Sequence, residues 1–160
     1  MVATRFMRKG ITKIYFVPTI TVLATPTTAQ ITAGTNLTPQ IAEVAGFTFT
    51  NNPISTPDMD TAFVSQIGGE DTGEASSMTF YELKGGTDSI HDAQTKGLNG
   101  YICIFYAGLA GGTPASGDKM EVWPITITSN ARVYSAGNEA AQYRVAYAIT
   151  GVPVAAVQGA

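Results

Sequence analysis

The sequence predicts a mainly β fold, either a β-sandwich or a small barrel of about seven strands with one short flanking α-helix. Two observations support this prediction. Apolar and polar residues alternate with the period of two that a half-buried strand requires, most clearly over Gln142–Thr150. Tyr143, Val145, Tyr147 and Ile149 share one face of this run. Turns rich in Gly, Pro and Asn separate it from similar short runs.

Seven segments have this strand character. Phe47 and Phe49 share one face of the second segment, and threonines occupy the other. Tyr101–Tyr106 is apolar on both faces, which predicts a central strand. Pro124 cannot donate a ladder hydrogen bond, so it marks an edge or a bulge. The expected strands are 12–17, 41–50, 60–67, 77–83, 101–106, 119–129 and 142–150.

The connection between the first two strands, residues 19–38, is rich in Thr and Pro and is expected to be extended, with a short strand at 29–32. The one expected helix is Ser89–Lys96. Asp88 can act as its N-cap, because its carboxylate can accept a hydrogen bond from a free N–H of the first turn. Gly97 can end the helix, because glycine readily adopts a positive φ.

Residues 1–160 are expected to form one domain with three appended segments. Residues 1–10 are expected to be an N-terminal arm. Residues 68–77 are expected to be a long exposed loop between two strands, because an acidic, glycine-rich composition suits neither a strand nor a helix. Residues 151–160, which are mostly small, are expected to be a C-terminal tail.

The charge distribution is uneven. The chain has 9 Lys and Arg against 12 Asp and Glu, with a net charge of −3 and a pI near 5.0, which disfavours a basic nucleic-acid-binding face. Arg5, Arg8 and Lys9 precede the first acidic residue, Glu43, whereas the middle of the chain is acidic. A basic arm and an acidic middle could pair between copies, and ordinary solvated charge is the alternative.

The sequence predicts no enzyme, no cofactor and no metal site. His91 and Asp92 are adjacent, and neighbouring residues on a helix point in different directions, so His91 is interpreted as a surface residue. Asp71-Thr72-Gly73 matches the tripeptide of aspartic proteases, but its flanks indicate an exposed loop rather than a site that shares one proton between two aspartates. Asp58 and Asp60 share one face of a strand-like segment and are interpreted as charges at a strand entry.

Cys103 is the single cysteine and lies in an apolar run, so it is expected to be a small buried hydrophobic residue without a disulfide partner. The N-terminus has bases but no continuous apolar region, so no signal peptide is predicted. No apolar segment reaches the ~20 residues that a membrane span requires, so no membrane partner is expected.

The order of several segments has a parallel in a known family. Gly46–Ile54 leads into Thr56–Asp60 and Phe63–Ser65, Ser77–Tyr81 follows the acidic stretch, and Asp118–Ile125 and Ser129–Arg132 come later. In this order the segments resemble the major tail tube protein of long-tailed, non-contractile bacteriophages, especially those that infect actinobacteria. The resemblance extends from about Thr4 to about Val154.

The resemblance implies a structural subunit that assembles into stacked hexameric rings, encloses the tape measure protein and conducts DNA during infection without binding it specifically. Tail tip and tail terminator proteins would be further partners, and the subunit would be assembled in the host cytoplasm and reside in the virion tail. The implied inter-subunit loop is Gly68, Gly69, Glu70, Asp71, Thr72, Gly73 and Glu74. An acidic lumen is hypothesised from Asp58, Asp60 and Glu82, and N-terminal arm contacts from Arg5, Arg8 and Lys9.

Three alternatives stay open. A carbohydrate- or receptor-binding β-sandwich of a phage or cell surface would need a platform of exposed aromatic residues, whereas the aromatic residues here mostly alternate toward a core. An enzyme would have to use Asp71. A capsid-associated or tail terminator protein could share a related fold.

Overall fold

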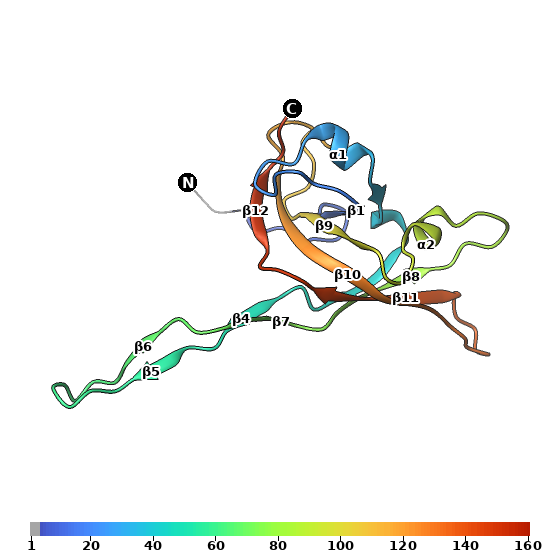
Figure 1. Ribbon diagram of the computed structural model, residues 1–160. Coiled ribbons are helices and arrows are strands. Elements are labelled where there is room, and N and C mark those ends of the chain that lie inside the picture. The colour runs from blue at the N-terminus through green and yellow to red at the C-terminus, as the bar shows by residue number, and fades with distance from the viewer. Residues whose placement is uncertain (1–3) are drawn as a thin grey trace.

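The computed structural model describes residues 4–160 and confirms a mainly β fold (Figure 1). One sheet holds eight strands, close to the predicted seven, and within the described residues it does not close into a barrel. Four further strands form two small two-stranded sheets. The strands are β1 (Lys13–Val17), β2 (Thr35–Asn36), β3 (Ile41–Ala45), β4 (Phe49–Asn51), β5 (Ile54–Thr56), β6 (Ser65–Ile67), β7 (Asp71–Gly73), β8 (Ser76–Tyr81), β9 (Asn99–Phe105), β10 (Lys119–Val133), β11 (Gln142–Ile149) and β12 (Val154–Val157). The helices are α1 (Thr28–Thr32), the 3-10 helix η1 (Thr38–Gln40) and α2 (Ser89–Ala93).

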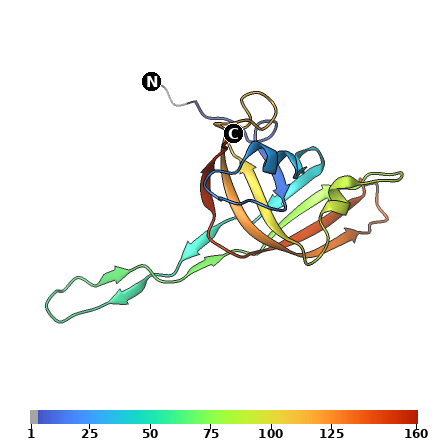
Figure 2. The same cartoon turned by 45° about the horizontal axis from the view of Figure 1, so that its top comes forward.

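The large sheet is antiparallel throughout, in the order β2-β1-β9-β10-β11-β8-β3, with β12 also paired to β10. The predicted central strand is confirmed, because β9 lies between β1 and β10. The longest strand, β10, curves across the body of the protein (Figure 2). It pairs with β12 along Lys119–Val122 and with β11 along Ile125–Val133.

Pro124 lies where β10 changes partner from β12 to β11. The Pro124 carbonyl accepts a hydrogen bond from the Thr150 N–H at 3.0 Å. The C=O and N–H of one strand residue point to the same edge, so the donor that proline lacks would face this connection between β11 and β12. Proline is therefore tolerated inside a paired strand, and the separate β-bulge of β10 lies between Ile127 and Ser129.

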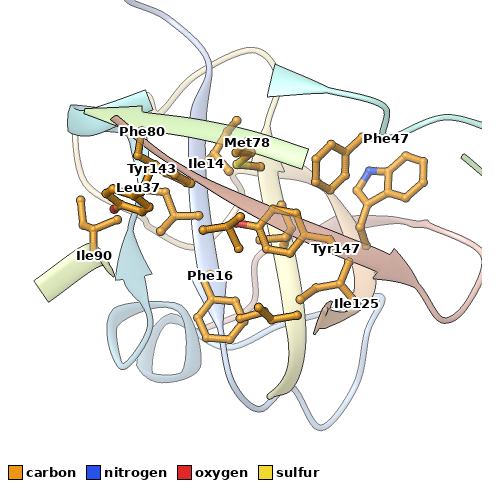
Figure 3. Close-up of a cluster of buried hydrophobic side chains, with 14 residues drawn as sticks. Ile14, Phe16, Leu37, Phe47, Met78, Phe80, Ile90, Ile125, Tyr143 and Tyr147 are labelled. Atoms are coloured by element: carbon orange, nitrogen blue, oxygen red, sulfur yellow. The ribbon is translucent and has the colours of Figure 1, made fainter. Parts of the chain in front are cut away.

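The main core lies on one face of the large sheet (Figure 3). The alternation predicted for β11 is confirmed, since Tyr143, Val145 and Tyr147 are buried there while Arg144 is exposed. Phe80 of β8 stacks on Tyr143 with ring centroids 5.2 Å apart. The other buried members of this core are Ile14, Phe16, Leu37, Phe47, Met78, Ile90, Ile102, Trp123, Ile125 and Ile127.

A second core covers the opposite face of β1, β9 and β10. In β9, Ile102 points into the main core and Cys103 into the second, which explains why this strand is apolar on both faces. Cys103 is fully buried, as predicted, and burial raises the pKa of its thiol to about 12. Ile20 and Ile31, from the connection after β1, complete this core.

The strand expected at 29–32 is wrong, because these residues belong to α1. Thr27 and Gln30 form a capping box: the Thr27 hydroxyl accepts from the Gln30 N–H at 3.3 Å, and the Gln30 side chain accepts from the Thr27 N–H at 3.1 Å. Ile31 is fully buried in the second core. Capping and burial therefore override the β preference of the Thr and Ile residues.

The predicted N-cap of α2 is confirmed, since Asp88 accepts a hydrogen bond from the His91 N–H at 3.3 Å. The helix ends at Ala93 rather than at Lys96, because Gln94 turns into the core. The Gln94 amide donates to the Ile90 carbonyl at 3.1 Å and accepts from the Tyr147 hydroxyl. These hydrogen bonds satisfy the polar atoms of a fully buried amide, which would otherwise destabilise the fold.

The two ends of the chain differ. The predicted C-terminal tail contains β12, so it is partly wrong: Val154–Val157 pairs with β10, and the Gln158 N–H donates to the Asp118 carbonyl at 2.8 Å. Residues 4–10 have neither strand nor helix, and the Arg8 carbonyl accepts from the N–H groups of Ile11 and Thr12. Residues 1–3 of the expected arm lie outside the described residues.

Candidate assembly site

Residues 48–75 form a long two-stranded hairpin, here called the arm, that projects from the body of the protein (Figures 1 and 2). Inside the large sheet, β3 pairs with β8. The same two stretches of chain continue outside the sheet as a ribbon, in which β4 pairs with β7 and β5 pairs with β6. Every residue of the arm except Thr56 and Gly69 is exposed.

Two predictions about this part of the chain are wrong. The loop expected at 68–77 contains β7 and the start of β8. The strand expected at 60–67 is only Ser65–Ile67.

Side-chain hydrogen bonds across the two strands hold the arm together where it has no core beneath it. The Asn51 amide donates to the Asp71 carboxylate at 2.7 Å and to the Gly69 carbonyl at 2.8 Å. Nearer the tip, the hydroxyls of Thr56 and Ser65 lie 2.9 Å apart. Such cross-strand pairs stabilise a ribbon that cannot depend on buried apolar area.

The tip of the arm is a turn organised by Asp58. The Asp58 carboxylate accepts from the N–H groups of Asp60 and Thr61, both at 2.9 Å. The expectation that Asp58 and Asp60 share one strand face is therefore wrong, because an aspartate that bonds the backbone two and three residues ahead favours a turn over a strand.

The surface of the arm combines acidic and apolar groups. It carries five carboxylates and no Lys or Arg. Met59 and Phe63, near the tip, are 105% and 79% exposed. The acidic residues are Asp58, Asp60, Glu70, Asp71 and Glu74, and the other exposed large apolar residues are Phe49, Ile54, Val64 and Ile67. Exposed apolar side chains gathered on one projecting element indicate a surface that another molecule covers.

The base of the arm crosses the end of β11 at close range. A Cβ atom added to Gly73 would lie 2.7 Å from the Ile149 Cβ, so only glycine permits this approach. On the partner strand, the Phe49 ring lies 6.4 Å from the Trp123 ring, centroid to centroid. The first residue pair of the arm, Phe49 and Gly73, therefore contacts the body, whereas the remainder of the arm extends beyond it.

The structure does not bring the hypothesised acidic residues together. Asp58 and Asp60 lie at the tip of the arm, whereas Glu82 follows the other end of β8. Glu82 accepts a hydrogen bond from the Arg132 Nε at 2.5 Å, and this pairing raises the pKa of Arg132. An acidic lumen formed by all three residues stays a prediction.

Arg5, Arg8 and Lys9 are exposed, and they stay predicted contact residues. The chain directly after them is tied to the body, because the Thr12 hydroxyl donates to the Tyr106 carbonyl at 3.0 Å. The segment that carries the three cations is therefore attached next to the end of β9, and the cations are accessible.

Two candidate chemistries have ordinary structural roles. Asp71, of the protease-like tripeptide, accepts from the Asn51 amide on an exposed strand. His91 and Asp92 lie with Nδ1 and Oδ1 3.1 Å apart, so the prediction that these side chains diverge is wrong. The imidazole and the Tyr143 ring form a nearly perpendicular pair with centroids 4.9 Å apart. Among residues 4–160 no three His, Cys, Asp or Glu side chains are grouped to hold a metal ion.

The part of the chain that the structure describes contains no helix with the length and apolar character needed to cross a bilayer. Its most exposed aromatic residues are dispersed: Phe63 lies near the tip of the arm and Tyr134 follows β10. This dispersal does not match the aromatic platform that a carbohydrate-binding module needs.

Comparison with protein-family models decides the family: the model described as phage tail tube protein matches residues 1–160. The chain belongs to the phage tail tube protein family. The resemblance drawn from the segment order is thereby confirmed. This tail tube protein is a structural component of the virion tail, and membership of a structural family favours a non-enzymatic role.

Solved structures give similar folds. A chain from the tail of an empty gene transfer agent (GTA) particle, computed with helical refinement and C6 symmetry, is 13% identical, with 89% of this tail tube protein and 93% of that chain covered and a TM-score of 0.50. A chain from the virion of a native GTA particle is 14% identical, with 78% and 89% covered and a TM-score of 0.47. Among curated proteins, no match to this tail tube protein was found.

Sequence reasoning did not identify the arm as a two-stranded hairpin. The predicted contact residues, Gly68–Glu74, lie on one strand of the arm, and whether they make contacts stays a prediction. The exposed apolar residues Met59 and Phe63 near the tip were not singled out. One usable signal was that Met59, between two aspartates, and Phe63, in the short run Ala62–Val64, lie in a segment without the continuous alternation that predicts a core.

Proposed function

We propose that this protein is the ring-forming subunit of a phage tail tube, in which stacked hexameric rings enclose a tape measure protein and conduct DNA. Family membership supports the tail tube role, and the C6 symmetry of the GTA tail that shares the fold is compatible with six subunits per ring. The proposal includes assembly in the host cytoplasm, with tail tip and terminator proteins at the two ends of the tube.

The projecting arm is the observation that carries this proposal. It has almost no buried residue, yet it presents apolar side chains at its tip. Burial of such side chains is worth about 1.5–3 kcal/mol each, so a second copy that covers the arm supplies the stabilisation that the isolated chain lacks. We infer that the arm, including Gly68–Glu74, contacts a neighbouring subunit or ring.

Open strand edges support closure into a ring. The outer edge of β3 has no partner strand among the described residues, and beyond Ile127 the strand β10 pairs only with β11. Open edges invite pairing with another chain. Edges on both sides of one sheet allow that sheet to continue from subunit to subunit around a rotational axis.

Charge is compatible with passage of DNA. Tight binding of nucleic acid depends on Lys and Arg that displace phosphate counterions, and this chain is acidic overall. We propose that Asp58, Asp60 and Glu82 make the lumen acidic in two separate bands, as their separation within the subunit requires. Tubes in which these carboxylates face outward would contradict this part of the proposal.

Negative-stain electron microscopy of the purified protein over a concentration series tests the function. We expect six-fold rings or hollow tubes above a critical concentration, with and without added tail tip complex as a nucleus. A chain that stays monomeric under both conditions contradicts the proposal. Retention of that monomer on a glycan resin would then favour the carbohydrate-binding alternative.

A further inference from the structure

The root of the arm has an unusual backbone. The regular pairing between the two strands stops at Ala45–Ser77 and resumes with the hydrogen bond from the Glu74 N–H to the Thr48 carbonyl at 2.9 Å, so the ladder is interrupted over residues 46–47 on one strand and 75–76 on the other. Gly46 and Phe47 have φ values of 84° and 57°, and Phe47 is the one non-glycine residue with a positive φ among the described residues. The left-handed region is costly for a bulky side chain. Such strain persists where the surrounding contacts impose it, which points to a function.

A serine hydroxyl joins the two strands across this interruption. The Phe47 N–H donates to the Ser76 hydroxyl oxygen at 2.9 Å, and that hydroxyl donates to the Glu74 carbonyl at 3.0 Å. Ser76 is only 3% exposed, so water competes little for these hydrogen bonds. The left-handed Phe47 is therefore held from the opposite strand where ladder bonds are missing.

The Phe47 ring anchors the root in the main core (Figure 3). Phe47 is 9% exposed, whereas residues 42–46 and 48–55 are all exposed. Its ring lies 5.8 Å from the Trp123 ring, nearly perpendicular at 85°, and 5.9 Å from the Tyr147 ring. Edge-to-face contacts of this kind add specificity to the burial of apolar area. The Phe47 ring therefore anchors the root in the core, next to the contact of the Phe49 ring with Trp123.

Two glycines pack the root closely on either side. A Cβ atom on Gly46 would lie 2.6 Å from both the Ala75 carbonyl oxygen and the Ser76 hydroxyl oxygen. On the other strand, Gly73 touches Ile149. Because backbone and side chains fill the space around the root, the strands leave the body in one direction.

We propose that the arm root is a latch that fixes the direction of the arm before a second copy of the chain binds it. Phe47 and Ser76 are then positioning residues for assembly. A segment that is already ordered loses less conformational freedom on binding, so the same contacts give a tighter assembly. This inference rests on the proposed function, because it assumes that the arm contacts a second copy.

The direct test measures the spread of arm directions in the monomer. Spin labels are attached at Met59→Cys near the tip and Lys119→Cys on the body, both exposed, while Cys103 is buried and does not compete. The distance distribution between the labels is expected to be narrow in the parent chain and broad in Ser76→Ala. Ser77→Ala is the matched control, because the Ser77 hydroxyl accepts from Arg144 at 2.9 Å and takes no part in the root.

The second test measures assembly of the unlabelled chains. Sedimentation and electron microscopy are expected to show a critical concentration about tenfold higher for Ser76→Ala than for Ser77→Ala, which corresponds to about 1.4 kcal/mol. Equal urea midpoints for the two variants would show that the body is equally stable. Phe47→Asn tolerates the left-handed backbone but lacks the ring, and it is expected to broaden the distances as well.

The outcomes separate the two proposals. Equal distance distributions in Ser76→Ala, Phe47→Asn and Ser77→Ala overturn the latch. A broad distribution with an unchanged critical concentration overturns its role in assembly. If the parent chain does not assemble, the proposed function fails, and the distance measurement alone then decides whether the latch exists.

Discussion

Phe47→Gly is expected to destabilise the protein less than Phe47→Ala, which reverses the usual order of these two residues. Both substitutions remove a ring that packs against Trp123 and Tyr147, at a cost of about 3–5 kcal/mol. The φ of 57° costs alanine a further ~1–2 kcal/mol and glycine nothing. Glycine in turn loses ~0.4–1 kcal/mol because its unfolded chain is more flexible. The difference favours glycine by roughly 0.8 kcal/mol.

Urea unfolding followed by far-ultraviolet circular dichroism measures this difference without depending on Trp123, whose surroundings both substitutions change. Thr48 supplies the matched pair, because it is exposed and is not among the residues with positive φ. Thr48→Ala is expected to be more stable than Thr48→Gly by about 0.4–1 kcal/mol. If alanine is at least as stable as glycine at position 47 while the control pair keeps the ordinary order, the strain at Phe47 is refuted.

Three further predictions concern the arm, the basic segment and the cysteine. Replacing residues 51–71 by a two-residue turn should change the free energy of unfolding by no more than about 0.5 kcal/mol, because no core residue is removed, and should abolish rings and tubes in electron micrographs. Reversing the charges of Arg8 and Lys9 to Glu should raise the critical concentration at low salt, with a smaller effect near 1 M salt, where the Debye length is ~3 Å; a salt-independent effect would exclude pairing with the acidic arm. The Cys103 thiol, with its pKa raised from 9.0 to about 12, should not react with a thiol reagent at pH 8 until the chain unfolds. Because the folded state keeps this proton while the unfolded state loses it, the thiol's contribution to stability should be lost as the pH rises from 9 toward 12, and Cys103→Ala should lack that contribution.

The elements of the body could be predicted because burial imposes a pattern on their sequences. Tyr143, Val145 and Tyr147 alternate with less buried residues because one face of β11 meets the core, and Tyr101–Phe105 of β9 is apolar because both faces of that strand pack against a core. Asp88 was identifiable as an N-cap because its hydrogen bond to the first turn is local in sequence. In each case a few residues that are neighbours in the sequence are enough to identify the element.

The arm could not be predicted in the same way, because neither of its faces is buried in the isolated chain. Without a core, the alternation of residues 48–75 is not constrained, and the Gly-rich acidic stretch looks like a loop. The contacts that make it a strand connect Asn51 with Asp71, far apart in the sequence. At Ile31 the error runs the other way, because a strand was predicted where the structure has a helix. The β preference of Ile31 is outweighed by the helix cap and by its burial in the second core.

The acidity of the arm bears on how copies meet. An exposed two-stranded ribbon has two open edges, and the simplest association would pair two arms edge to edge in a symmetric dimer. That arrangement would bring together two sets of five carboxylates with no Lys or Arg between them. Like charges on opposing strands destabilise a pair, so the arm disfavours its own copy as a partner. Under the proposed function, the apolar tip residues are then expected to meet a different surface of the neighbouring subunit, and a contact between two unlike surfaces generates rings or stacks rather than closed pairs.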